Sequence, residues 1–471
     1  MFRPLLAAAA LMLPLSASAA APPAPPPVPD VTARDLRWLR TNLIDAYDKH
    51  GRKDPKWDAD VREALEATVK WWGDDPDADL DEADRVFVLS GKAIAAGCTD
   101  PLVRMMRVVS GWGTWDPAWR ADFETEVKPL AEIIADAPYH PLLRCRAQLL
   151  IVHLRRGKCE EAREYSDEFL RDARARTDSA LDLLGRGGQD PAATSGRVLR
   201  LALLAVDELM PLHRRDRTQV VERVAAALEK ADRRAATLAF RGHQMTKSAW
   251  DARGSGWAKD VNEKGWKLFG ERLLEAEALL KKAWELDKVG TEVPRYMLTV
   301  ELGLNRGHGN LELWFERVMR RNPYHADACE AKLYYLEPKW YGSEDGREML
   351  EFARRLRKDQ PPANPVTLLI VDAHETLAGY QKDRAEYLAR PEVWAEIRTA
   401  YLDHLAAKPR SVAARSRFAW LAHKFGKHED AHKQFEILGN RARFGTFGGR
   451  NQYLRMKFLS AEAVDKSGGG K

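Results

Sequence analysis

Apolar residues along this chain recur mostly every three or four positions. In one stretch they fall at Leu273, Ala276, Leu280 and Ala283, the spacing of a single buried helix face. The apolar run 366–371 (VTLLIV) follows an Asn-Pro pair, and this opening favours a buried helix over a strand. No alternation of apolar and polar residues persists between turn signals. The pattern therefore predicts helices almost throughout.

A second pattern joins helices into pairs: a turn glycine, an alanine five residues later, and then a large apolar residue. It occurs as Gly157, Ala162, Phe169 and as Gly426, Ala431, Phe435. Between them, Leu280, Phe315 and Phe352 lie 35 and 37 residues apart. Periods near 34 residues are typical of stacked helix pairs. The predicted fold class is all-α, a tetratricopeptide-like array of antiparallel helix pairs, or α-solenoid.

The first thirty residues are expected to lie outside this fold. Arg3 precedes an apolar stretch of eleven residues (5–15), and Ala17-Ser18-Ala19 forms a small-x-small cleavage site. Eleven residues are too few for a membrane helix, which needs roughly 20. We expect residues 1–19 to be a signal peptide and 20–30 (AAPPAPPPVPD) a Pro-rich spacer. The protein is then exported to the periplasm or the extracellular space, with no membrane span.

The rest of the chain contains a glycine-rich loop at Gly185–Gly196, and the array is either one superhelix or two stacked halves separated there. Residues 31–186 would form N-terminal helical repeats, 197–462 C-terminal tetratricopeptide-like repeats, and 463–471 a disordered tail. In such an array each unit packs only on its neighbours, so chain length is not limited by the size of one core.

Charge and cysteine content narrow the function classes. The net charge is only +5 and is locally mixed, which argues against nucleic-acid binding. Four cysteines in an exported chain suggest a disulfide, either Cys98 with Cys145 or Cys98 with Cys159. Cys145 and Cys159 are not expected to pair, because a turn at Gly157 would separate them by most of a helix. Cys329 is expected to pack as a small apolar side chain.

One segment carries a catalytic pattern. His428, Glu429 and His432 satisfy H-E-x-x-H, in which two histidines on one helix face hold zinc and the glutamate activates water. A charged Asp430 lies between the histidines and no third ligand is evident, while Ala431 is already explained by helix packing. We therefore predict no metal, no cofactor and no enzymatic activity. The alternative is a metal-dependent hydrolase or cell-envelope enzyme that uses this HEDAH segment.

Tryptophan supplies the candidate binding residues. The chain has 15, and several stand beside glycine or basic residues. Most are expected to pack between helices. In the functional interpretation, five residues line a concave groove that binds a protein or peptide of the cell envelope. A glycan is an equally compatible ligand for this groove. These residues are Trp250, Arg253, Trp257, Lys339 and Trp340.

The same region resembles a known family. The strings AWDARGSGWA, EMLEFARRL and above all YLEPKWYGS (335–343) are similar to exported bacterial tetratricopeptide-like proteins of a domain of unknown function. AAGCTDPLV (95–103) is similar to the N-terminal half of that family. The resemblance implies a tetratricopeptide-like helical fold and assigns no activity or catalytic residue.

Overall fold

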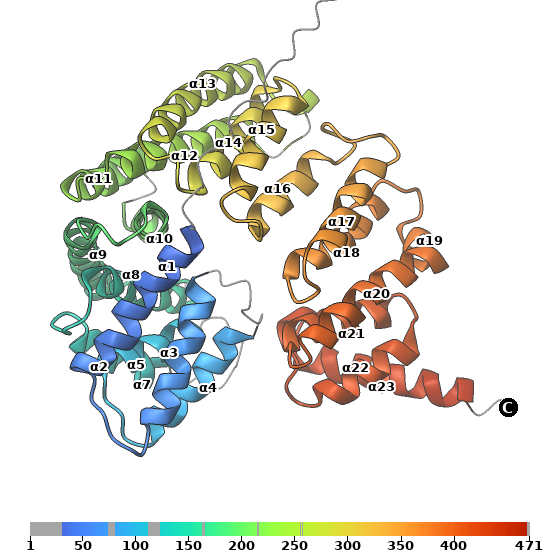
Figure 1. Ribbon diagram of the computed structural model, residues 1–471, viewed down its shortest axis with the longest axis horizontal. Helices are drawn as coiled ribbons and strands as arrows, with labels where there is room; N and C mark the ends of the chain where they lie inside the picture. The colour runs from blue at the N-terminus through green and yellow to red at the C-terminus, as the bar shows by residue number, and fades with distance from the viewer. Residues whose placement is uncertain are drawn as a thin grey trace, which may run out of the picture.

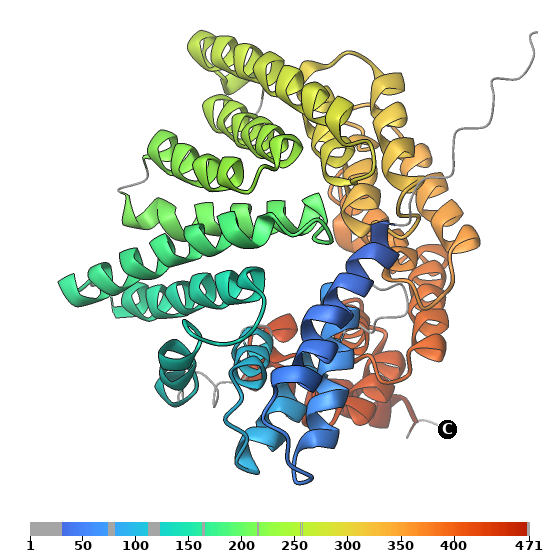
Figure 2. The same cartoon turned by 60° about the vertical axis from the view of Figure 1, so that its left-hand side comes forward.

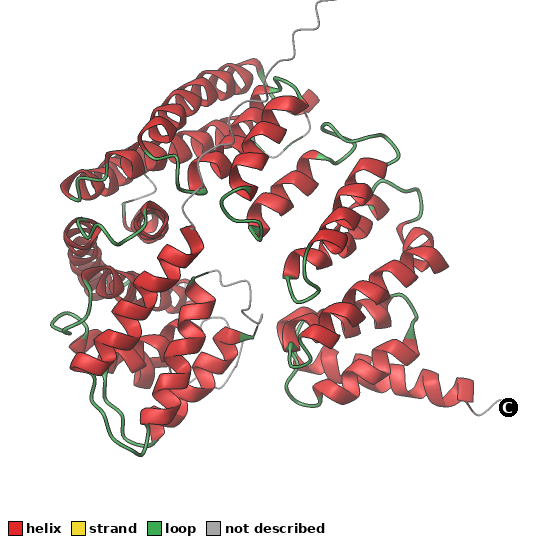
Figure 3. Cartoon of the chain, viewed as in Figure 1, coloured by secondary structure: helices red, strands yellow, loops and turns green. Residues whose placement is uncertain are grey.

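A computed structural model describes residues 31–73, 81–111, 123–162, 165–213, 216–254, 256 and 258–468. These residues are helices and loops with no strand among them, as Figure 3 shows, so the predicted all-α class is confirmed. The signal peptide and the Pro-rich spacer lie outside the described residues. No helix in the described ranges is both long enough and apolar enough to cross a membrane.

The N-terminal half contains helices of very different lengths. They are α1 (Val31–Arg40), η1 (Thr41–Asp45), α2 (Ala46–His50), α3 (Asp58–Trp72), α4 (Glu82–Ala95), α5 (Pro101–Gly111), α7 (Phe123–Ile133), α8 (Pro141–Ala162), α9 (Asp167–Gly188), α10 (Ser195–Leu212) and α11 (Arg217–Lys230).

The remaining helices continue the array to the C-terminus. They are α12 (Arg234–Arg253), η2 (Ala258–Asp260), α13 (Glu263–Leu286), α14 (Glu292–Leu304), α15 (His308–Met319), α16 (Ala326–Tyr335), α17 (Arg347–Asp359), η3 (Pro365–Leu368), α18 (Leu369–Ala378), α19 (Arg384–Ala389), α20 (Pro391–Ala407), α21 (Val412–Lys424), α22 (His428–Leu438), η4 (Phe444–Phe447) and α23 (Arg450–Gly468).

Consecutive helices pack side by side as antiparallel pairs, for example α3 with α4, α12 with α13, and α21 with α22. The last pair confirms the glycine-alanine-aromatic pattern. Gly426 turns the chain with φ +68, a value that favours glycine, and both Ala431 and Phe435 are fully buried. The equally spaced Leu280, Phe315 and Phe352 are also buried, on α13, α15 and α17.

The turn predicted from the other copy of the pattern was wrong. Gly157 lies inside α8, which continues to Ala162, so the reversal comes only before α9. Contacts with α10 hold α8 as far as the residue before Gly157: the buried Glu208 carboxylate accepts hydrogen bonds from His153 (2.7 Å) and Arg156 (3.2 Å). A single glycine has only a modest preference for a break, and α8 continues through it.

Element boundaries differ from expectation in two other places. The predicted loop Gly185–Gly196 is much shorter, because α9 runs to Gly188 and α10 begins at Ser195. The tail predicted from residue 463 is helical as far as Gly468, while 469–471 lie outside the described residues. The run 366–371 is helical and mostly buried, as predicted.

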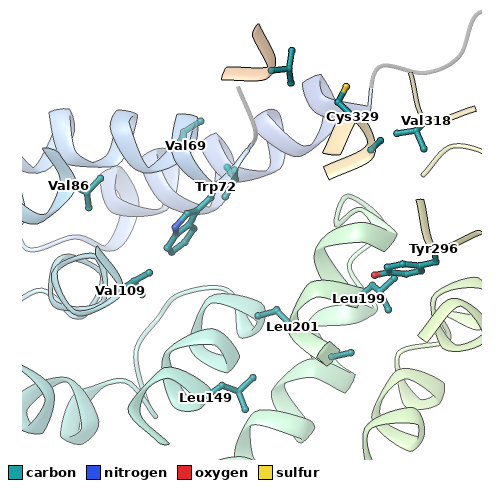
Figure 4. Close-up of a cluster of buried hydrophobic side chains, with 14 of the residues drawn as sticks. Val69, Trp72, Val86, Val109, Leu149, Leu199, Leu201, Tyr296, Val318 and Cys329 are labelled. Carbon is teal, nitrogen blue, oxygen red and sulfur yellow. The ribbon is translucent and has the colours of Figure 1, made fainter. Parts of the chain in front are cut away.

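One apolar core runs through the array from Trp38 to Tyr453. Figure 4 shows part of it, with Val69 of α3, Val86 of α4 and Leu149 of α8 among its side chains. The four cysteines form no disulfide with one another, contrary to the pairing that export suggested. Burial raises the pKa of the Cys145 and Cys329 thiols to about 12, so both behave as small apolar side chains.

The array curves until its two ends meet. In Figures 1 and 2 the C-terminal helices α20 to α23 return to the N-terminal helices α3 and α4. The Asp81 carboxylate, just before α4, accepts the backbone N–H groups of Val412 and Ala413 at the start of α21. Arg443 adds ion pairs to Asp81 (3.4 Å) and Asp84 (3.5 Å). We call these contacts the closing seam.

Candidate functional site

The first part of the site is the junction of α12 and α13. Trp250 lies in the last turn of α12 and packs edge-on against Phe269 of α13, with ring centroids 5.0 Å apart. Asn262 begins α13, where its side chain accepts the Gly265 N–H at 2.7 Å. This cap fixes where α13 begins and so sets Phe269 against the indole of Trp250.

The second part is the loop after α16, which contains the YLEPKWYGS string. The loop is held by its own backbone: the Trp340 N–H donates to the Glu337 carbonyl (2.9 Å) and the Tyr341 N–H to the Tyr335 carbonyl (3.1 Å). A Cβ on Gly342 would lie 1.8 Å from the Leu336 carbonyl oxygen, so only glycine fits there. Much of the string is therefore explained by the shape of one rigid turn.

The two tryptophans meet between these parts. The rings of Trp250 and Trp340 pack edge to face, with centroids 6.4 Å apart and an interplanar angle of 81°. Both indole Nε1 atoms are buried, and neither N–H donates a hydrogen bond. A buried donor without an acceptor costs about 1–3 kcal/mol. Two rings that each carry such a donor are in contact here.

A small apolar cavity of about 190 Å³ adjoins the pair. Its lining is Trp250, Leu298, Thr299, Leu302, Ala331, Tyr334 and Tyr335. Three further rings at the site are exposed by two fifths: Trp266 (41%), Tyr334 (42%) and Tyr380 (43%). We define the aromatic cluster as Trp250, Trp266, Tyr334, Trp340 and Tyr380. Sequence reasoning missed Trp266, Tyr334 and Tyr380, because no spacing rule connects them to the two predicted tryptophans.

The cations of the site already have partners. Arg253 lies over the rings of Trp250 (5.7 Å) and Trp266 (5.5 Å), and it donates to the Gly254 and Gly256 carbonyls at the end of α12. Lys339 pairs with the Glu337 carboxylate at 2.9 Å. The fifth predicted residue, Trp257, lies outside the described residues. The structure thus brings four of the five together, with Lys339 in an ion pair and Arg253 hydrogen-bonded to backbone carbonyls.

The HEDAH segment forms the first turn and a half of α22. Its central Asp430 accepts hydrogen bonds from the Arg398 guanidinium (2.9 Å) and from the Trp394 indole (3.3 Å). Ala431 is fully buried against α21. The residues described here contain no group of three His, Cys, Asp or Glu side chains placed to hold a metal. These contacts fit the packing role better than the catalytic one.

No family model matches the sequence, and no curated protein matches it. Among solved structures, yeast Tom70 is 12% identical, with a TM-score of 0.27 over 92% of this chain and 96% of that one. The human IFIT1 dimer with m7Gppp-AAAA is 12% identical, with a TM-score of 0.26 over 92% of this chain and 95% of that one. Both scores are below the level that indicates a common fold, so the architecture rests on this chain's own helix pairs.

Proposed function

We propose that this protein is an exported helical-repeat scaffold that binds a protein or peptide through a concave surface, with the aromatic cluster as its contact point. The observation that carries the proposal is the pair of buried indole N–H donors, Trp250 and Trp340, that have no acceptor. An extended peptide offers a row of backbone carbonyls, which are the acceptors that such donors lack.

The adjoining cavity supports a peptide over a larger organic ligand. At about 190 Å³ it is smaller than the roughly 300–1,000 Å³ of typical small-molecule sites. An engineered apolar cavity of about 150 Å³ holds one benzene ring. The cavity therefore suits a single apolar side chain, while the partly exposed Trp266 and Tyr334 offer aromatic surface to the residues on either side.

The partners that Lys339 and Arg253 already have indicate which kind of peptide fits. Because Lys339 is paired with Glu337 and Arg253 with carbonyl oxygens, neither cation needs a carboxylate from the ligand. The ligand that fits is an apolar or aromatic peptide segment with no requirement for acidic residues. We base the proposal that the protein is exported, and that its partner lies in the cell envelope, on the N-terminal sequence.

Selection from a random peptide display library tests the site. The full chain should enrich peptides with a large apolar residue, and Trp340→Phe should weaken their binding about tenfold, the effect of about 1.4 kcal/mol for one lost hydrogen bond. The substitution keeps an aromatic ring but removes part of the indole together with the N–H, so a small fall in Tm from the lost volume is expected, and the control below must share it.

The matched control is Trp420→Phe. Trp420 is a half-buried tryptophan of α21 that packs against Lys424, away from the cluster. It should leave peptide binding unchanged. Equal binding by the parent and Trp340→Phe, or equal loss in both variants, would contradict the proposal.

A further inference from the structure

A second cavity lies among α1, α3, α8 and α10. It has a volume of about 240 Å³. Its lining combines two tryptophans, three arginines and four leucines: Trp38, Trp72, Arg146, Arg197, Arg200, Leu142, Leu143, Leu201 and Leu204. No carboxylate is among them. Figure 4 shows Trp72 of α3 and Leu201 of α10 on facing sides of this region.

Arg146 is the least compensated charge of this cavity. Its guanidinium lies 4.1 Å from the ring centroid of Trp72, and within the described part of the chain it makes no ion pair and no hydrogen bond. Burial, and then the positive charges of Arg197 and Arg200, lower the pKa of Arg146 to about 9. The side chain is partly buried, and a cation removed from much of its water without an anion beside it is costly.

The other two arginines are held in place from outside the cavity. Arg197 donates to both oxygens of Asp35, at 3.1 and 2.6 Å, and lies 4.6 Å from the ring centroid of Trp38. Arg200 also reaches Asp35 (3.1 Å) and pairs at 3.7 Å with Glu292. These acids fix the guanidinium groups without filling the cavity.

The arrangement is thus preorganised and positively charged. The side chain of Arg200 is 48% exposed, whereas that of Arg197 is only 7% exposed, so the cavity reaches solvent at Arg200. Guanidinium groups bind carboxylates and phosphates with paired hydrogen bonds. The indoles and leucines favour an apolar substituent next to that anionic group.

We infer that this cavity binds an oxyanion, a carboxylate or a phosphate, carried on a short apolar group. We call it the arginine pocket. In the bound state the oxyanion lies against Arg146, and Trp38 and Trp72 cover the apolar group. The inference is independent of the aromatic cluster, which belongs to other helices.

Isothermal titration calorimetry of the full chain in low salt provides the test, with hexanoate, hexyl phosphate and hexanol as probes. The expected result is saturable binding of at least one anion and none of hexanol. Hexanoate binding more tightly identifies a carboxylate ligand, and the reverse order identifies a phosphate ligand. Binding of hexanol as tight as that of the anions, or no binding of any probe, would overturn the inference.

Variants of Arg146 separate binding from packing. Arg146→Met should weaken anion binding at least tenfold and leave Tm equal or higher, because it removes a partly buried charge that has no anion beside it. Arg146→Lys keeps a cation and should bind within a few-fold of the parent. The charge-matched control is Arg174→Met, at an exposed position of α9. Parent-like binding by Arg146→Met would refute the inference. Should that variant fail to fold, Arg200→Gln must show the tenfold loss instead.

Discussion

Replacing Asp81 with alanine is the sharpest test of how the array closes on itself. The carboxylate caps α21 from across the molecule, because it accepts the N–H groups of Val412 and Ala413. Loss of a helix N-cap costs about 1 kcal/mol. The Arg443 pair at 3.4 Å is partly exposed and adds at most about 1 kcal/mol.

The expected destabilisation is therefore about 1–2 kcal/mol, or a few degrees of Tm. This cost falls on the contact between the two ends, whereas the apolar core inside each helix pair stays intact. The variant should consequently separate the ends of the array, and small-angle X-ray scattering should show a larger radius of gyration. Circular dichroism should show unchanged helix content.

Ser411→Ala is the matched control. Ser411 caps the same helix from within the chain, where its hydroxyl accepts the Ala414 N–H at 3.4 Å. Its loss should lower Tm by a similar or smaller amount without expanding the molecule. The reasoning fails if Asp81→Ala keeps the parent radius of gyration, or if Ser411→Ala expands the array equally.

Two further predictions concern the pH dependence of stability and the rigid loop. Burial alone would raise the pKa of Glu396, but hydrogen bonds led by that of Arg354 outweigh it and lower the pKa from 4.5 to about 2. Because the folded pKa is depressed, Glu396 stabilises the fold fully above pH 4.5, and at most about 3 kcal/mol is lost as the pH falls towards 2. Thermal melts of Glu396→Gln should show a shallower loss between pH 6 and 3 than the parent, and the exposed Glu392→Gln should match the parent. In the loop, Gly342→Ala should lower Tm and weaken peptide binding, since its Cβ would strike the Leu336 carbonyl; Gly309→Ala, which meets no atom within 4 Å in α15, should raise Tm slightly. A Gly342→Ala protein that melts and binds like the parent would show that the loop can shift freely.

The sequence predicts the helices well because the apolar spacing is local. Leu273, Ala276 and Leu280 share one helix face whatever that helix packs against, and all three are buried. A glycine is a weaker signal. Gly426 turns the chain and Gly157 lies inside α8, although both precede an alanine by five residues, so a glycine at this spacing does not by itself fix a turn.

The two candidate sites differ in how much local sequence reveals of them. Trp250 and Trp340 stand out beside glycine and lysine, and the structure places them in contact. The arginine pocket has no such signal, because Trp38, Arg146 and Arg197 come from three helices that only the curvature of the array brings together. The same holds for Asp81, whose partners on α21 lie more than three hundred positions away.

The closing seam changes what the number of repeats means for this protein. In an open array each unit adds a fixed small rotation, and units can be gained or lost because nothing depends on where the last one ends. Here the N-terminus of α21 must lie next to the Asp81 carboxylate. Adding or deleting one helix pair would rotate the N-terminus of α21 away from this carboxylate. Evolution of this chain by duplication of units is thereby restricted, and its length is set by the angle needed to complete one circuit.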